Sequence, residues 1–166
     1  MNATRSIKDG VGETEWAVRV ELAAAYRVFD MLGWTHLIHT HITASVPGEK
    51  DHYLINPYGL LWEEINASSL IKVDAGGEIV HQGSTDCPIN PAGFTIHSAI
   101  HAAREDAHCV MHLHTDYGVA VSAQPGGLLP LSQHALIAGH DIVYHDYEGI
   151  ALNHDERERI VADMGD

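Results

Sequence analysis

Two histidines in a short alternating segment have the spacing of metal ligands. His112 and His114 are two residues apart in residues 108–114, where side chains alternate between two faces as they do in a β-strand. Residues two apart on a strand share a face, with about 6.6 Å of rise between them, and imidazole nitrogens bind zinc at roughly 2.0–2.1 Å. Both rings can reach one cation. The spacing predicts a metal site, although so short a motif also arises by chance in a chain with 14 histidines.

Two other groups of histidines offer alternatives. His97 and His101 are four residues apart in a segment of helical periodicity, a spacing that suits a metal as well as a packing face. No carboxylate accompanies them, so solvated or core histidines are the simpler interpretation. His36, His39 and His41 precede a β-prone region, and alternation puts the last two on one face, as pocket or hydrogen-bonding residues.

The segments that position these histidines have recognisable periods. Residues 36–57 are rich in Thr, Ile, Val and Tyr and are broken by a turn at 47–50, which predicts two strands. Residues 70–73 and 78–80 flank Asp-Ala-Gly-Gly, which predicts a hairpin. Residues 13–32 predict an amphipathic helix that ends at Gly33. Its expected apolar stripe is Trp16, Val20, Ala23, Ala24 and Met31.

The second half of the chain continues the mixture of helices and strands. Residues 94–104 predict a helix whose apolar face holds Ile96, Ala99, Ile100 and Ala103, with His97 on another face. Residues 141–145 are β-prone, and residues 155–164 predict a charged helix. Antiparallel hairpins mixed with helices indicate an α+β domain with α/β/α layers, and not a doubly wound sheet.

Composition limits the classes of function. The 166 residues are 45% hydrophobic and 19% charged, which is typical of one globular domain. A net charge of −14 opposes binding to nucleic acid or to anionic membranes. No run approaches the roughly 20 apolar residues of a membrane span, and residues 1–10 lack the apolar core of a signal peptide. A cytoplasmic protein acting on a small molecule is expected.

The order of several motifs resembles the class II aldolase/adducin family. The motifs are Gly33-Trp34, His41-Ile42-Thr43-Ala44, Ile55-Asn56-Pro57-Tyr58-Gly59, Asn90-Pro91-Ala92-Gly93 and His112-Leu113-His114-Thr115. Together they extend from about residue 13 to the chain end, which makes the match far more specific than any one motif. The resemblance implies an α/β/α sandwich around a mainly antiparallel sheet, and a homo-oligomer, usually a tetramer, with active sites between subunits.

The resemblance also implies roles for particular residues. The family's metal-binding His-x-His corresponds to His112 and His114, with zinc as the expected metal and iron, manganese or cobalt as alternatives. His41, Asn56 and Gly93 fall in motifs that line the substrate site. The tyrosine that donates a proton from a neighbouring subunit aligns with His134, and histidine is a residue type that can transfer protons. Residues 1–166 would form a single domain that lacks its C-terminal segment, where the third metal-binding histidine of the family lies.

Departures from the family pattern change the expected reaction. Fuculose-phosphate aldolase has a Pro-Ser-Ser-Glu type segment where this chain has Asn90-Pro91-Ala92-Gly93. The two phosphate-binding hydroxyls and the carboxylate base are therefore replaced, and an aldol reaction needs a base within hydrogen-bond reach of the proton it removes. Sugar phosphates are not expected as substrates.

Three functions are compatible with these residues. The leading hypothesis is a metal-dependent lyase, of aldolase or decarboxylase type, acting on a small hydroxy or oxo carbonyl compound. A second is a non-haem iron oxygenase on the same scaffold, which would consume dioxygen. A third is a non-catalytic interaction module like that of adducin, because fold does not fix function. The paired histidines favour the first two.

Overall fold

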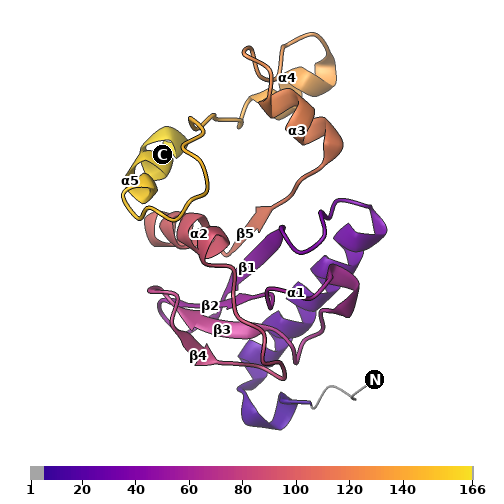
Figure 1. Ribbon diagram of the computed structural model, residues 1–166, viewed down its shortest axis with the longest axis vertical. Helices are drawn as coiled ribbons and strands as arrows, with labels where there is room; N and C mark the ends of the chain where they lie inside the picture. The colour runs from indigo at the N-terminus through magenta and orange to yellow at the C-terminus, as the bar shows by residue number, and fades with distance from the viewer. Residues whose placement is uncertain (1–5, 166) are drawn as a thin grey trace.

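A five-stranded antiparallel sheet forms the middle layer of the molecule in the computed structural model, which describes residues 6–165 (Figure 1). Its strands are β1 (His41–Ser45), β2 (His52–Ile55), β3 (Ile71–Asp74), β4 (Ile79–His81) and β5 (Cys109–His112). Their order is β4-β3-β2-β1-β5, and every neighbouring pair is antiparallel. Both predicted hairpins are present, but β5 crosses over to pair with β1.

Helices cover both faces of this sheet. The long helix α1 (Glu13–Met31) packs against β1 and the short 3-10 helix η2 (Trp62–Glu64), whereas α2 (Pro91–Ala103) packs against β1 and β5. The C-terminal helix α5 (Glu156–Met164) lies on α2, and a 3-10 turn η1 (Lys8–Gly10) precedes α1. The predicted α+β sandwich is confirmed, as is the end of α1, where Gly33 adopts a φ of 69° that suits glycine.

The alternation of the strands divides the core into two clusters. Ile42 and Leu54 face α1, where they join Leu22 and Tyr26. On the opposite face, Tyr53, Ile55, Ile71 and Val73 pack with Phe94 of α2. Because odd and even positions of β1 point to opposite faces, His41 and Thr43 lie on the α2 side.

The predicted apolar stripe of α1 was wrong in part, since Ala23 is buried in the core but other members are exposed. Val20 is 47% exposed and Met31 is 85% exposed, whereas the buried positions of the helix include Glu15 and Arg19. Apolar periodicity could not reveal this face, because its charged residues are paired with groups from distant parts of the chain.

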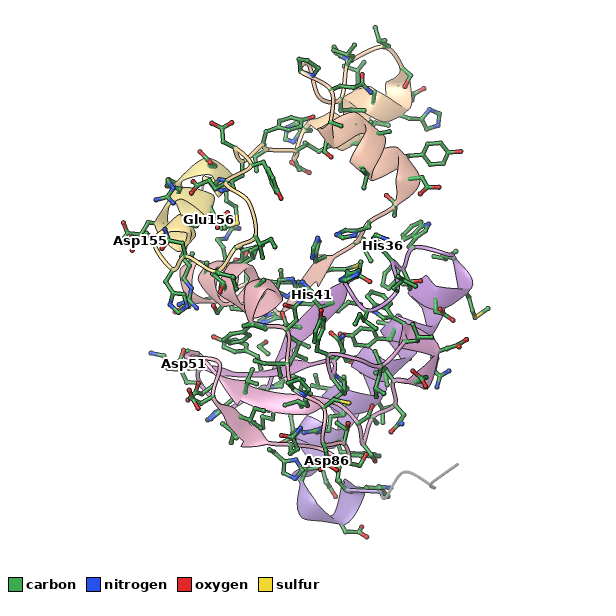
Figure 2. The ribbon with its side chains drawn as sticks, in the orientation of Figure 1. His36, His41, Asp51, Asp86, Asp155 and Glu156 are labelled. Atoms are coloured by element: carbon green, nitrogen blue, oxygen red, sulfur yellow. The ribbon has the colours of Figure 1, made fainter. Side chains whose placement is uncertain are left out.

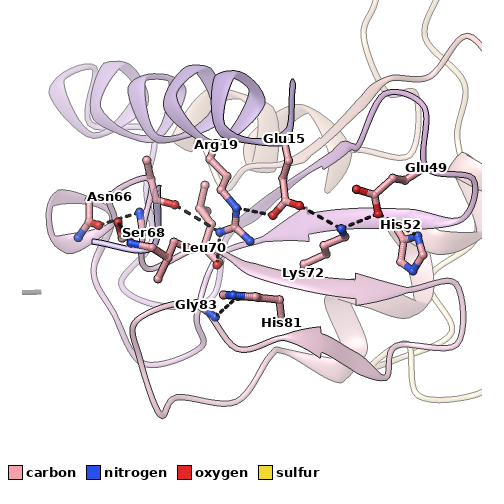
Figure 3. A network of polar contacts seen from close by, with 12 residues as sticks. Glu15, Arg19, Glu49, His52, Asn66, Ser68, Leu70, Lys72, His81 and Gly83 are labelled. Carbon is pink, nitrogen blue, oxygen red and sulfur yellow. Dashed lines mark hydrogen bonds and ion pairs between the residues drawn. The ribbon is translucent and has the colours of Figure 1, made fainter. Parts of the chain in front are cut away.

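A buried ion-pair network joins α1 to the sheet (Figure 3). Arg19 Nε donates to Glu15 Oε1 at 2.7 Å, and Arg19 Nη1 donates to the carbonyl of Leu70 at 2.6 Å. Lys72 Nζ on β3 donates to Glu15 Oε2 at 3.0 Å and also meets Glu49. Burial alone would raise the pKa of Glu15, but the hydrogen bonds from Arg19 and Lys72 outweigh it and hold this pKa below its ordinary value. The carboxylate is therefore fully ionised near neutral pH.

Two short helices stand away from the sheet. Figure 1 shows α3 (Asp116–Ser122) and α4 (Gln133–Gly139) beyond the end of β5, and neither contains a buried residue. Residues 141–145, predicted as β-prone, form no strand. Large exposed apolar side chains gather in this part of the chain, among them Tyr117, Leu131, Ile137, Tyr147 and Ile150.

Replacing Arg19 with methionine should destabilise the protein strongly. The change keeps most of the side-chain volume but leaves the buried Glu15 carboxylate with only Lys72, and removing one partner of a buried pair costs about 3–5 kcal/mol. The free energy of unfolding from urea denaturation provides the measurement. Arg27→Met, at an exposed position of the same helix, is the matched control and should change stability by less than about 0.5 kcal/mol. Equal effects of the two substitutions would contradict a structural role for the network.

Candidate metal centre and histidine chain

The pairing of β1 with β5 brings His41 and His112 together. The two residues are direct cross-strand partners, and Thr43 pairs with Val110 two positions further along. Opposite residues of an antiparallel pair lie about 4.5–5.5 Å apart on the same face. The rings of His41 and His112 accordingly have centroids 4.6 Å apart, and both lie on the α2 side of the sheet.

Helix α2 supplies two more histidines from above this face. Asn90 caps the helix by accepting a hydrogen bond from the Gly93 backbone N–H, and Pro91 occupies the first turn, so the helix begins earlier than predicted. His97 and His101 are buried against the sheet. The predicted apolar face was wrong in part, since Ala99 is buried but Ala103 is exposed. These histidines therefore form a polar core between helix and sheet.

The buried groups are joined end to end by hydrogen bonds. His101 Nδ1 lies 2.8 Å from the Ala107 carbonyl, and its Nε2 lies 2.8 Å from Thr43 Oγ1. Thr43 Oγ1 is also 2.8 Å from His97 Nδ1. His97 Nε2 then contacts His41 Nδ1 at 3.1 Å. We call the series that ends at His112 the histidine chain: Ala107 carbonyl, His101, Thr43, His97, His41 and His112.

The last link of the histidine chain reaches the candidate metal ligands. His41 Nε2 lies 2.9 Å from His112 Nδ1, and His112 Nε2 lies 3.0 Å from His114 Nε2. His114 Nδ1 in turn contacts His36 Nδ1 at 2.9 Å. Figure 2 labels His41 beside α2 and His36 in the loop before β1, so the series of rings extends from the core to the surface.

Burial keeps these imidazoles uncharged at neutral pH. It lowers the pKa of His41 to about 3, aided by the nearby His112 and His114, and it lowers the pKa of His112 to about 4, aided by His114. Burial lowers the pKa of His97 well below its ordinary value, and burial also lowers the pKa values of His101 and His114. Within residues 6–165, no carboxylate hydrogen-bonds to any ring of the histidine chain. A metal requires neutral imidazole, so the charge state suits ligation.

The facing nitrogens of His112 and His114 fit a shared cation. Two nitrogens bound at about 2.1 Å to one tetrahedral zinc lie about 3.4 Å apart, and the observed separation of 3.0 Å is a few tenths of an ångström shorter. In the part of the chain that the structure describes, no group of three or more His, Cys, Asp or Glu is arranged to hold a metal. The residues present therefore offer a pair of ligands, with further ligands to come from water, substrate or other protein groups.

Gly93 leaves room for the ring of His41. A Cβ atom built on Gly93 would lie 2.3 Å from His41 Nε2, a distance that no real contact allows. The space that a side chain at position 93 would enter is therefore filled by the neutral imidazole of His41 from β1. Of the three residues predicted to line the substrate site, His41 and Gly93 are in contact with each other.

Asn56 and His134 lie apart from this centre. The buried Asn56 has its Oδ1 2.8 Å from the Tyr26 hydroxyl, which also contacts the backbone of Ile42 on the α1 side of the sheet. This arrangement favours a role in the framework. His134 is exposed on α4, and within the described residues no hydrogen bond joins its side chain to the histidine chain.

The structure adds three groups that sequence reasoning did not assign to the site. His97 and His101 were considered as a separate metal pair or as core residues, and their rings instead link the sheet to the Ala107 carbonyl. Thr43 was seen only as part of a motif. Alternation on β1 places it on the same face as His41, and this was the one available signal.

Comparison with known proteins agrees with this architecture. A protein from Caulobacter vibrioides assigned to aldolase class 2 is 62% identical over 98% of this chain, which spans 62% of that protein's length. Mouse alpha-adducin is 51% identical over 91% of the chain, which spans 20% of that protein.

Solved structures agree as well. An aldolase II superfamily protein from Pseudomonas syringae superposes with a TM-score of 0.92 at 56% identity, over 98% of this chain and 65% of that one. L-fuculose 1-phosphate aldolase from Glaciozyma antarctica PI12 superposes with a TM-score of 0.78 at 29% identity, over 99% of this chain and 61% of that one. Residues 20–166 also match the model of the class II aldolase and adducin N-terminal domain. The chain therefore belongs to the class II aldolase and adducin family.

Proposed function

We propose that this chain carries the metal site of a lyase that acts on a small hydroxy or oxo carbonyl compound. The observation that carries the proposal is the pair of uncharged imidazoles, His112 and His114, whose Nε2 atoms face each other at 3.0 Å. Zinc is the expected metal, and iron, manganese and cobalt also accept imidazole ligands. A divalent cation held there would supply Lewis-acid polarisation of a carbonyl or enediolate oxygen.

The protein's own contribution is to hold the ligand pair in place. His41 contacts the second nitrogen of His112 at 2.9 Å, and such outer partners orient a ligating ring. The strand β5 ends at His112, so it holds that ring in place, whereas His114 lies two residues beyond its end. Helix α2 and the sheet cover the inner side of His112. On the outer side, the half-buried His114 contacts the exposed His36, so this end of the series is open to solvent.

Zinc binding tests the proposal directly. In titration calorimetry at pH 7, the chain should bind zinc, and His112→Ala combined with His114→Ala should abolish most of this binding because both facing nitrogens are lost. His154→Ala, at an exposed position, controls for unspecific binding by histidine and should leave the affinity unchanged. Unchanged affinity in the double variant would place any bound metal elsewhere and remove the support for a lyase.

Sugar-phosphate aldolase activity should be absent or very low, despite the similarity to a fuculose-phosphate aldolase. Turnover should stay well below about 1 s⁻¹, the lower end of typical enzyme rates, because Gly93 provides no base and Pro91 and Ala92 provide no hydroxyls. Gly93→Glu should not restore it. Its Cβ would collide with His41, so the variant should also bind zinc more weakly than the wild type. A coupled assay with L-fuculose 1-phosphate checks the first expectation, and efficient turnover by either protein would contradict it.

A non-catalytic interaction module is the second candidate, and the similarity to alpha-adducin favours it. The two candidates differ in what they require of His112 and His114. An interaction surface has no need of two facing imidazoles, whereas a lyase does. The calorimetric experiment above separates them, and consumption of dioxygen by the iron-loaded protein would instead indicate an oxygenase.

We further propose that the chain assembles as a homo-oligomer and that His134 acts across the interface. The exposed apolar side chains on and around α3 and α4, such as Tyr117 at 87% and Leu131 at 83%, form the kind of surface that a partner subunit covers. His134 lies on α4, remote from its own histidine chain, so any proton transfer by this residue would occur at a neighbouring subunit's site. In residues 6–165, no helix is long and apolar enough to cross a membrane, so these side chains do not form a membrane span.

Sedimentation velocity over a range of protein concentrations measures this assembly. The chain should sediment as an oligomer, and Leu131→Asp combined with Ile137→Asp should shift it toward the monomer because two charges then oppose burial of the surface. Glu158→Asp on the exposed side of α5 is the control. A monomer at every concentration would exclude both the assembly and a role for His134 across it.

A further inference from the structure

At the Ala107 end of the histidine chain, donor and acceptor in the hydrogen bond are fixed. A backbone carbonyl only accepts hydrogen bonds, so His101 must donate from Nδ1 to the Ala107 oxygen at 2.8 Å. A neutral imidazole carries one N–H, and burial lowers the pKa of His101, which keeps it neutral. Nε2 of His101 is therefore an acceptor, and the Thr43 hydroxyl, 2.8 Å away, must donate to it.

The donor and acceptor at Thr43 then fix those of His97. A hydroxyl has a single proton, and Thr43 gives that proton to His101. Its oxygen must then accept the hydrogen bond from His97 Nδ1, at 2.8 Å. His97, buried and neutral, is left with an unprotonated Nε2, which can only accept.

The same reasoning continues to the candidate metal ligand. His41 donates from Nδ1 to His97 Nε2 at 3.1 Å, which leaves His41 Nε2 as an acceptor. His112 must then donate from Nδ1 to His41 at 2.9 Å. The remaining nitrogen of His112, Nε2, carries no proton and faces His114.

We infer that the histidine chain fixes His112 in the Nδ1-protonated tautomer and thereby presents its Nε2 lone pair for a cation. His101, Thr43, His97 and His41 are positioning residues in this scheme, since they act through His112. The inference deepens the proposed function and rests on it for the identity of the ligand bound at Nε2. The tautomer itself follows from the hydrogen bonds and from the neutral state of the buried rings.

The outer pair behaves differently. In the absence of a cation, His114 can donate from Nε2 to His112 and accept at Nδ1 from His36. Cation binding requires His114 to carry its proton on Nδ1 and to donate it to His36 instead. No carbonyl fixes the direction there and His36 is exposed, so this exchange is open to solvent. The tautomer of His112 is thus fixed by hydrogen bonds in the core, whereas the tautomer of His114 can change when a cation binds.

Gly93 is part of the same arrangement. Any side chain at this position would displace the His41 ring, which among residues 6–165 alone links His112 to the rest of the histidine chain. The absence of a carboxylate at position 93 and the presence of a histidine at position 41 therefore belong together. The ring of His41, which orients His112, occupies the space that a side chain at position 93 would fill.

Nitrogen-15 NMR of the metal-free protein tests the tautomers directly. In long-range ¹H–¹⁵N correlation spectra, protonated and unprotonated ring nitrogens have different chemical shifts. His41, His97, His101 and His112 should all be protonated at Nδ1 and bare at Nε2. An Nε2-protonated His112 in the wild-type protein would overturn the inference, whatever its affinity for metals.

Substitutions of Thr43 test the link between the histidine chain and the metal. Thr43→Val keeps the shape but removes the hydroxyl that transmits direction, so His112 should become a mixture of tautomers and zinc affinity should fall by about tenfold, the lower limit for outer partners. Thr43→Ser retains the hydroxyl and should restore both properties. Thr40→Val is the matched control, because the Thr40 hydroxyl is buried without a hydrogen-bond partner among the described residues.

The outcomes separate this inference from the proposed function. Loss of the uniform tautomer in Thr43→Val but not in Thr40→Val supports the inference, even if the wild-type protein binds no zinc and the lyase proposal fails. An unchanged tautomer and an unchanged zinc affinity in a folded Thr43→Val protein would refute it. If that variant does not fold, the wild-type spectrum decides the question.

Discussion

The antiparallel pairing of β1 with β5 is the constraint on which the site depends. It sets His41 opposite His112 and leaves their rings 4.6 Å apart on the face covered by α2. A shift of either strand by one residue would turn its histidine to the α1 face and separate it from the other, because strand side chains alternate. The candidate metal ligands and the hydrogen bonds of the histidine chain therefore both depend on the register of β1 with β5.

Burial of several imidazoles between a helix and a sheet requires that each polar nitrogen find a partner. An unsatisfied buried donor or acceptor costs about 1–3 kcal/mol. The histidine chain meets this requirement by linking each ring to the next and ending at the Ala107 carbonyl. The stacking of His101 on Tyr53, with centroids 4.5 Å apart, fills the apolar side of the same space. The same hydrogen bonds therefore give the buried imidazoles their partners and orient His112.

On the α1 face of the sheet, the buried polar groups are charged and form ion pairs. There, the charges of Glu15, Arg19 and Lys72 compensate one another, and the Leu70 carbonyl accepts from the guanidinium. This network fastens α1 to β3, and the neutral histidines fasten α2 to β1. Among residues 6–165 no carboxylate hydrogen-bonds to the histidine chain, where such a group would favour protonated histidine and oppose cation binding.

The sequence by itself determined the elements and the family, because hydrophobic period, turn residues and ordered motifs are local properties. Both hairpins, α1 and α5 were predicted within a few residues, and His112 and His114 were predicted as metal ligands from their spacing together with the family resemblance. The buried face of α1 was not, since Glu15 and Arg19 look solvent-exposed until Lys72, far along the chain, is placed beside them. The roles of Thr43, His97 and His101 in the histidine chain likewise could not be predicted from the sequence. A hydrogen-bond direction is set by the group at its far end, and only the tertiary structure brings the Ala107 carbonyl within reach of His101.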